Sequence, residues 1–436
     1  MKGISLFQGI LLGTFGIAAV VGLIVFSTHT SQTSTSSIGT VTIWGTLPKE
    51  GMQGLLITAA QTDASFKEVS YTEKDATTLP QDLAAAIAIG KGPDLLITSQ
   101  EELRTLAKFL LPIPFANLPQ STFNAAFVGE GKLLATEDGT GYYGMPFLVD
   151  PLVLYSNRAI LATNGIAKPP ATWEALTGLA PKIVATTPTR QITRALIALG
   201  TYNNVKNARG VLSTLFLQTG VPLSTYGSGG FAANLGNSSA DSSAPGQSVL
   251  GFYTQFADPS KLSYTWNASL DNSQRAFIAG DLALYLGYAS EAAYLTEANP
   301  NLDYDASPMP QPETATTKTV YARLYSLMIP RGAQNSAGAF QVAALLTNAA
   351  EQADAASATG LAPASLTALS ADAPTNSVGA VAYAEALYAK GWLSPSPATT
   401  DAIFSSMIGD VVSGRSPSSV ALTGAEQSLT AALQKL

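Results

Sequence analysis

Residues 139–173 read GTGYYGMPFLVDPLVLYSNRAILATNGIAKPPATW, and the rest of the chain is best interpreted outward from this stretch. A Gly/Tyr turn at 141–144 precedes a run rich in strand-forming residues over 148–155, which predicts a β-strand. Asn157 stands where a helix can begin, and Thr172 is placed to cap another helix. The stretch therefore predicts one strand followed by two helix starts.

On the amino-terminal side, apolar periodicity predicts alternating strands and helices. The predicted strands are 41–44, 66–71 and 95–97, and the predicted helices are 51–60 and 79–89. This order is typical of a parallel sheet with helices on both faces. The glycine-rich turn at 90–92 follows a helix instead of leading one, which disfavours a dinucleotide site.

On the carboxyl-terminal side, helices are predicted at 193–199 and 205–219, and a loop without regular structure at 226–247. A strand is predicted at 321–330 and a helix at 337–348. The chain from Val378 onward is predicted to be mainly helical. No internal repeat is visible.

Composition excludes several kinds of chemistry. The 436 residues contain no cysteine and one histidine, His29. Disulfides and thiolate metal sites are therefore impossible, and histidine-based catalysis or metal binding has no residue in the predicted globular part. We expect neither a metal nor a cofactor, and the composition argues against an enzyme.

The net charge of −7, with no cluster of basic residues, argues against binding to nucleic acid or to anionic membrane surfaces. Charged residues make up only 12% of the chain. Ser, Thr, Ala and Gly are abundant instead, as is common on the surfaces of extracytoplasmic proteins.

The amino terminus is expected to anchor the protein in a membrane. Residues 4–26 form 23 uncharged residues, roughly 35 Å as a helix, which is enough to span a bilayer. Lys2 precedes this run, so the positive-inside rule places the folded part outside the cell membrane. A cleaved signal peptide or a buried helix are the alternatives for residues 1–26. Residues 27–40 are a Ser/Thr-rich linker that contains His29.

Four groups of residues resemble extracellular solute-binding proteins of carbohydrate ABC importers, the maltodextrin-binding type. The densest group lies within 139–176, at Gly144, Pro146, Phe147, Tyr155, Asn157, Arg158, Gly165, Pro169, Pro170, Thr172, Trp173, Glu174 and Leu176. The others are GKGPD at 90–94, a Phe-Tyr/Asp-Pro/Tyr-Thr-Trp-Asn pattern across 251–283, and ATGLAP at 358–363. Leu284 departs from the pattern, where the family usually has Met.

The resemblance implies an α/β, two-lobed periplasmic-binding-protein-like fold (type II), here preceded by one transmembrane helix. Lobe I would comprise 41–150 plus 324–362, and lobe II 151–323 plus 363–436, with crossings near Asp150, Tyr325 and Leu361. The implied partners are a small solute, most naturally a carbohydrate, and the permease subunits of an ABC transporter. The protein would act as a monomer.

A sugar receptor needs aromatic faces to stack on pyranose rings and polar groups to hold hydroxyls. By position in the resembling motifs, the predicted ligand-binding residues are Trp44, Thr98, Gln100, Asp150, Arg190, Gln191, Tyr226, Trp266, Tyr288, Ser290, Arg323 and Tyr325. Trp173 and Trp392 are instead predicted to pack in the core, and Asp94 to hold the entry of a strand.

Two other functions remain open. A glycan hydrolase would need two carboxylates from separate elements, and the adjacent pairs 101–102, 137–138 and 303/305 are too close in sequence. These pairs are interpreted as solvated surface acids. A two-lobed adhesion or sensing module without a small ligand is the third possibility.

Overall fold

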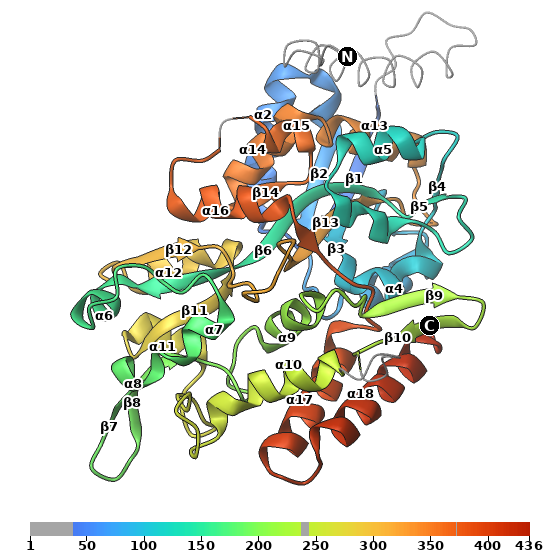
Figure 1. The fold of residues 1–436 in the computed structure, drawn as a ribbon. Helices are drawn as coiled ribbons and strands as arrows, with labels where there is room; N and C mark the ends of the chain where they lie inside the picture. Colours follow the sequence, from blue (N-terminus) through green and yellow to red (C-terminus); the bar gives the residue numbers. More distant parts are fainter. Residues whose placement is uncertain (1–37, 237–243, 372) are drawn as a thin grey trace, which may run out of the picture.

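The computed structural model describes residues 38–236, 244–371 and 373–436 (Figure 1). The predicted anchor (1–26) and most of the predicted linker lie outside these residues. Within the described ranges, no helix has the length and apolar character needed to cross a membrane.

The first lobe begins with a parallel sheet. Strand β1 (Val41–Gly45) pairs in parallel with β2 (Val69–Glu73) and with β3 (Leu95–Ser99), and helices α2 (Lys49–Thr62) and α3 (Leu79–Ala88) connect them. The predicted strand at 66–71 begins late, because the Asp63 carboxylate accepts a hydrogen bond from the Ser65 amide and starts a 3-10 helix, η1 (Ala64–Glu68).

Two long strands pass through the sheet where the lobes meet. Strand β6 (Met145–Asn157) is buried along its whole length and runs antiparallel to β13 (Val320–Met328). The amino-terminal half of β6 pairs with β13, and its carboxyl-terminal half pairs with β11 (Leu282–Tyr288). One continuous sheet therefore serves both lobes, as Figure 1 shows.

The second lobe extends this sheet. The strand order is β2-β1-β3-β13-β6-β11-β8-β7, with β7 at Ala185–Thr186 and β8 at Ile192–Ile197. The helix predicted at 193–199 is wrong, because these residues form β8 beside β11. The short apolar run Ala195–Ile197 is buried in the sheet, and such a run fits a buried strand as well as a helix.

The prediction of a structureless loop from Tyr226 is also wrong for its first part. Strands β9 (Ser224–Gly227) and β10 (Gly230–Ala233) form an antiparallel hairpin. Gly230 has a φ of 85°, which glycine adopts without steric cost, so the chain can reverse within two residues. Residues 237–243 lie outside the described part.

Helices cover both lobes. The longer ones are α9 (Ala208–Leu217), α10 (Pro245–Thr254), α13 (Ser336–Leu346), α14 (Ala349–Thr359), α16 (Ser377–Ala386), α17 (Pro397–Val412) and α18 (Ser418–Leu433). Shorter helices are α4 (Leu103–Leu106), α5 (Gln120–Ala126), α6 (Arg158–Thr163), α7 (Trp173–Thr177), α8 (Ala180–Ile183), α11 (Ser273–Ala279), α12 (Ala292–Ala298) and α15 (Leu366–Leu369). Remaining short elements include β4 (Ile113–Pro114), β5 (Gly141–Tyr142), β12 (Tyr304–Ser307), β14 (Ala362–Pro363), β15 (Ala389–Lys390), and the 3-10 helices η2 (Gln100–Glu102) and η4 (Gly129–Leu134).

The predicted caps and packing residues are confirmed. Asn157 accepts a hydrogen bond from the Ile160 amide at the start of α6, and Thr172 accepts one from the Ala175 amide at the start of α7. Trp173 and Trp392 are buried in the core of the second lobe. Both caps are set by nearby residues, so the local sequence was enough to predict them.

Asp94 also has the predicted structural role. Its carboxylate accepts hydrogen bonds from the amide and hydroxyl of Thr42, both at 2.9 Å, and from the amide of Asn335 at 2.8 Å. Asp94 thus fixes the entry of β3 against β1 and the start of α13.

Candidate functional site

A cleft of about 890 Å³ lies between the lobes, where β1 and β3 end. The first lobe contributes Thr46, Thr98 and Glu102 to its wall, and the second lobe contributes Arg209 and Asp401. In open α/β sheets, ligands bind beside the carboxyl ends of the strands. The cleft occupies this position, and its volume suits a small organic ligand.

An ion-pair network joins the two walls of the cleft. Arg209 on α9 lies with Nη2 3.0 Å from Glu101 Oε1 and Nη1 2.6 Å from Asp401 Oδ2. The Tyr321 hydroxyl donates to the same Glu101 oxygen at 2.7 Å. Burial alone would raise the pKa of Glu101, but Arg209 and Arg323 hold it below its usual value. Glu101 is therefore an anion in the floor of the cleft.

The interpretation of Glu101 and Glu102 as solvated surface acids is wrong. The two residues are only 5% and 6% exposed. They form η2 directly after β3, and this turn points them between the lobes instead of outward. Burial and the neighbouring Glu101 raise the pKa of Glu102 to about 7, although Arg209 acts in the opposite direction.

Arg323 and Asp150 face each other on β13 and β6, where they are register partners. The Arg323 guanidinium lies 3.7 Å from the ring centre of Tyr288, a cation–π distance. Its Nε is 3.3 Å from Glu101 Oε2. The amide and hydroxyl of Ser290 donate to the two oxygens of Asp150, at 3.0 and 2.8 Å. Burial raises the pKa of Asp150 to about 6, against the lowering effects of Arg323 and these hydrogen bonds.

Three of the predicted ligand-binding residues line the cleft itself: Thr98, Arg323 and Tyr325. Tyr288 lines a smaller hollow of about 250 Å³, which shares Arg209, Arg323 and Asp401 with the cleft. The Arg209 network thus separates the two spaces.

Gln100 is fully buried, and both polar atoms of its side-chain amide form hydrogen bonds with the backbone of β13. Its Nε2 donates to Ala322 O at 3.0 Å, and its Oε1 accepts from the Leu324 amide at 2.6 Å. These two bonds tie the end of β3 to the strand shared by both lobes.

The other predicted residues lie elsewhere. The Trp44 ring is half-buried and has Lys74 Nζ 3.9 Å above it. Trp266 is 1% exposed and packs in the core. Arg190 and Gln191 are exposed in the turn between β7 and β8, at the edge of the sheet farthest from β3 in strand order.

Tyr226 is on the β9–β10 hairpin, 55% exposed, with its ring 4.9 Å from that of Phe231. The face of Phe231 is in turn 3.9 Å from the guanidinium carbon of Arg104 on α4. The hairpin therefore bridges to the first lobe, but Tyr226 does not line the cleft.

Four residues of the site were not predicted from the sequence to bind a ligand: Glu101, Glu102, Arg209 and Asp401. Arg209 had one available signal, since it is the only charged residue in the otherwise apolar and small segment of α9. A charge within a buried helix is expected to have a partner. The partner itself, 108 positions away in the sequence, had no signal.

A family model for bacterial extracellular solute-binding proteins matches residues 56–406. The chain belongs to this family. A search of the curated proteins found no match.

Solved structures show the same fold as this solute-binding protein. The cyclic alpha-maltosyl-1,6-maltose binding protein of Arthrobacter globiformis aligns with a TM-score of 0.72 and 15% identity, over 91% of this chain and 99% of that one. A cyclo/maltodextrin-binding protein in complex with maltotetraose aligns with a TM-score of 0.71 and 15% identity, over 93% and 100%. The maltodextrin-binding domain of Bdellovibrio bacteriovorus, bound to maltotriose, gives 0.66 and 15%, over 91% and 99%.

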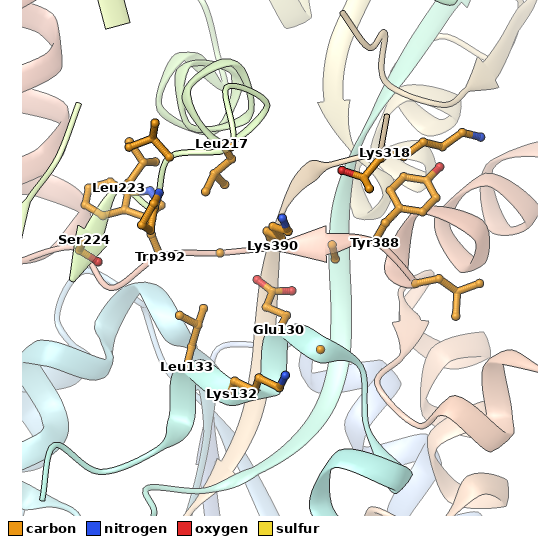
Figure 2. A pocket seen from close by; sticks show the side chains of 18 residues that line it. Glu130, Lys132, Leu133, Leu217, Leu223, Ser224, Lys318, Tyr388, Lys390 and Trp392 are labelled. Atoms are coloured by element: carbon orange, nitrogen blue, oxygen red, sulfur yellow. The ribbon is translucent and has the colours of Figure 1, made fainter. Parts of the chain in front are cut away.

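The solute-binding protein has a second hollow, of about 670 Å³, between η4 and the segment 387–392 (Figure 2). Figure 2 shows Glu130 beneath Lys390, with Trp392 beside Leu217 and Leu223. None of the twelve predicted ligand residues lines it. Both Glu130 oxygens lack a hydrogen bond among the described residues, and burial, with a smaller effect of Glu101, raises the pKa of Glu130 well above its usual value.

The described residues contain no group of three His, Asp or Glu side chains arranged to hold a metal ion.

Proposed function

We propose that this protein is an extracytoplasmic receptor that binds a carbohydrate in the cleft and delivers it to an ABC permease. The observation that carries the proposal is the cleft at the ends of β1 and β3, to which both lobes of a solute-binding fold contribute polar and charged side chains. The sugar complexes of the structural neighbours support carbohydrate as the substrate class.

Closure of the lobes around the ligand is the proposed signal to the permease. A ligand that touches both walls favours the closed state through its higher affinity for it. We assign 41–150 plus 324–362 to lobe I and 151–323 plus 363–436 to lobe II, as the resemblance implies, with one change. Helix α15 packs against α5 and α14, so it is better assigned to lobe I, with the last crossing after it.

The amino-terminal segment is proposed to act as a single-pass anchor. Residues 1–26 would span the cell membrane, and residues 27–40 would give the folded part a root-mean-square reach of about 20 Å. Such a tether keeps a monomeric receptor at high effective concentration beside its permease. The proposal includes no cofactor and no nucleic acid.

The test is a thermal-shift screen of the full chain in detergent against mono- and oligosaccharides, amino acids and polyamines. A ligand at 100 times its Kd stabilises the folded state by about 2.7 kcal/mol. A shift with one sugar class, with the sugar recovered unchanged, is the expected result. Hydrolysed sugar would instead identify a glycan hydrolase. No shift with any solute would overturn the receptor function and favour an adhesion or sensing module.

A further inference from the structure

Glu102 differs from the other carboxyl groups of the cleft because it has no partner. Glu101 is paired with two arginines, and Asp401 is paired with Arg209 and accepts a hydrogen bond from the Tyr202 hydroxyl at 2.5 Å. Among the described residues, Glu102 forms neither a hydrogen bond nor an ion pair, although it is 6% exposed and lines the cleft. An acidic group buried to this extent is expected to be paired.

Among the described residues, the cations near the cleft form no direct ion pair with Glu102, although Arg209 is close enough to act on its pKa. Arg209 is bound to Glu101 and Asp401, and Arg323 lies between Glu101 and the ring of Tyr288. Lys435, at the end of α18, is exposed on the rim and forms no ion pair with Glu102 within the described residues. A direct ion-pair partner for an ionised Glu102 would therefore be supplied by the ligand.

Closure would make this requirement stricter. When a cleft closes, water leaves it, and a carboxylate that loses water either takes up a proton or is stabilised in its ionised form by a hydrogen-bond donor that also carries positive charge. A sugar hydroxyl supplies only the donor, whereas an ammonium group supplies both in a charge-assisted hydrogen bond.

We infer that the ligand of the cleft is an amino sugar, whose protonated nitrogen is received by Glu102. This inference rests on the proposed receptor function and names its substrate class. The half-buried ring of Tyr325 lines the same cleft and offers a face to the sugar ring. The pKa of Glu102, raised to about 7 by burial and by Glu101, would fall when a cation lies beside it, so bound ligand keeps the carboxylate ionised.

The experiment compares matched sugars by isothermal titration of the full chain in detergent at pH 7. The pairs are 6-amino-6-deoxyglucose with glucose, and glucosamine with N-acetylglucosamine, and maltotetraose serves as a neutral oligosaccharide. We expect the amine of at least one pair to bind ten-fold or more tightly than its neutral partner. Glu102→Gln should reduce that ratio below two-fold.

Two controls keep the result interpretable. Glu102→Gln removes an unpaired buried charge, so this variant should melt no lower than the parent chain. Glu297→Gln changes an exposed acid on α12, so it should leave the ratio of amine to neutral affinity unchanged. Neutral sugars that bind as tightly as the amines would overturn this inference while leaving the carbohydrate receptor standing. Failure of every sugar to bind would overturn both.

Discussion

Arg209 Nη2 lies 3.0 Å from Glu101 Oε1, and this ion pair connects α9 of the second lobe to the turn after β3 in the first. The two side chains are 14% and 6% exposed. Together with Thr105 Oγ1, which donates to Pro395 O at 3.2 Å, the pair connects the two walls of the cleft.

We expect Arg209→Gln to destabilise the protein and to open the cleft. Removing the guanidinium leaves the buried Glu101 carboxylate with less positive charge beside it. Removing one partner of a buried ion pair lowers the free energy of unfolding by about 3 kcal/mol or more. Urea unfolding should show a lower midpoint, and small-angle X-ray scattering a larger radius of gyration. Arg158→Gln is the matched control, because its ion pair with Asp303 at 3.6 Å has side chains 62% and 61% exposed and contributes little. An equal loss in both variants would contradict the assigned role of Arg209.

Gln100→Met should lower stability without weakening ligand binding by the protein that remains folded. The substitution keeps the volume but leaves Ala322 O and the Leu324 amide without the bonds that Gln100 makes, at about 1–3 kcal/mol for each buried group left unpaired. Chemical denaturation measures the first effect and titration with the best ligand measures the second. A large loss of affinity with unchanged stability would make Gln100 a ligand contact.

Tyr325→Ala and Tyr226→Ala should separate a cleft residue from a surface one. Tyr325 lines the cleft, whereas Tyr226 is on the hairpin outside it. Loss of an aromatic face against a sugar ring should weaken binding at least ten-fold for Tyr325→Ala, and by less than two-fold for Tyr226→Ala. Titration calorimetry with the ligand found in the screen checks both values. A larger loss of affinity for Tyr226→Ala than for Tyr325→Ala would indicate that the ligand binds at the hairpin.

Stability should fall as the pH rises from 5 to 8, in part through Glu385. Burial raises the pKa of Glu385 to about 8 in the folded state, despite hydrogen bonds from the Met309 amide and the Tyr388 hydroxyl and the nearby charge of Lys318. Over this range the folded state binds the proton more often than the unfolded state, so unfolding becomes easier as the pH rises. One such group contributes at most about 1.4 kcal/mol per pH unit.

The measurement is urea unfolding at half-unit pH steps. Glu385→Gln, which can still accept from the Met309 amide, should flatten the slope, and Glu297→Gln should not. An equal slope in Glu385→Gln and the parent chain would show that Glu385 does not hold a proton in the folded protein over this range.

Sequence patterns were sufficient where neighbouring residues determine the structure. The caps at Asn157 and Thr172, the strand predicted over 148–155, which lies within the longer β6, and the packing of Trp173 all follow from local spacing, and the family resemblance supplied the two lobes. The helix predicted at 193–199 failed because a short apolar run is compatible with both a helix and a buried strand.

The charged centre of the cleft could not be predicted in the same way. Glu101 and Glu102 look like any exposed acidic pair, and only the approach of α9 and β13, more than 100 residues later, buries them. Arg190 shows the opposite case, since a motif position suggested a ligand contact and the chain places it in an exposed turn.

Strands β6 and β13 run through both lobes, with hydrogen bonds to each other and to the strands on either side. Separating the lobes from one another would break this shared ladder, so unfolding one lobe removes strand pairing on which the other depends. The protein is therefore expected to melt in a single cooperative transition, with calorimetric and van't Hoff enthalpies that agree. In that respect the two lobes constitute one thermodynamic unit, even though we propose that they close around the ligand as two bodies.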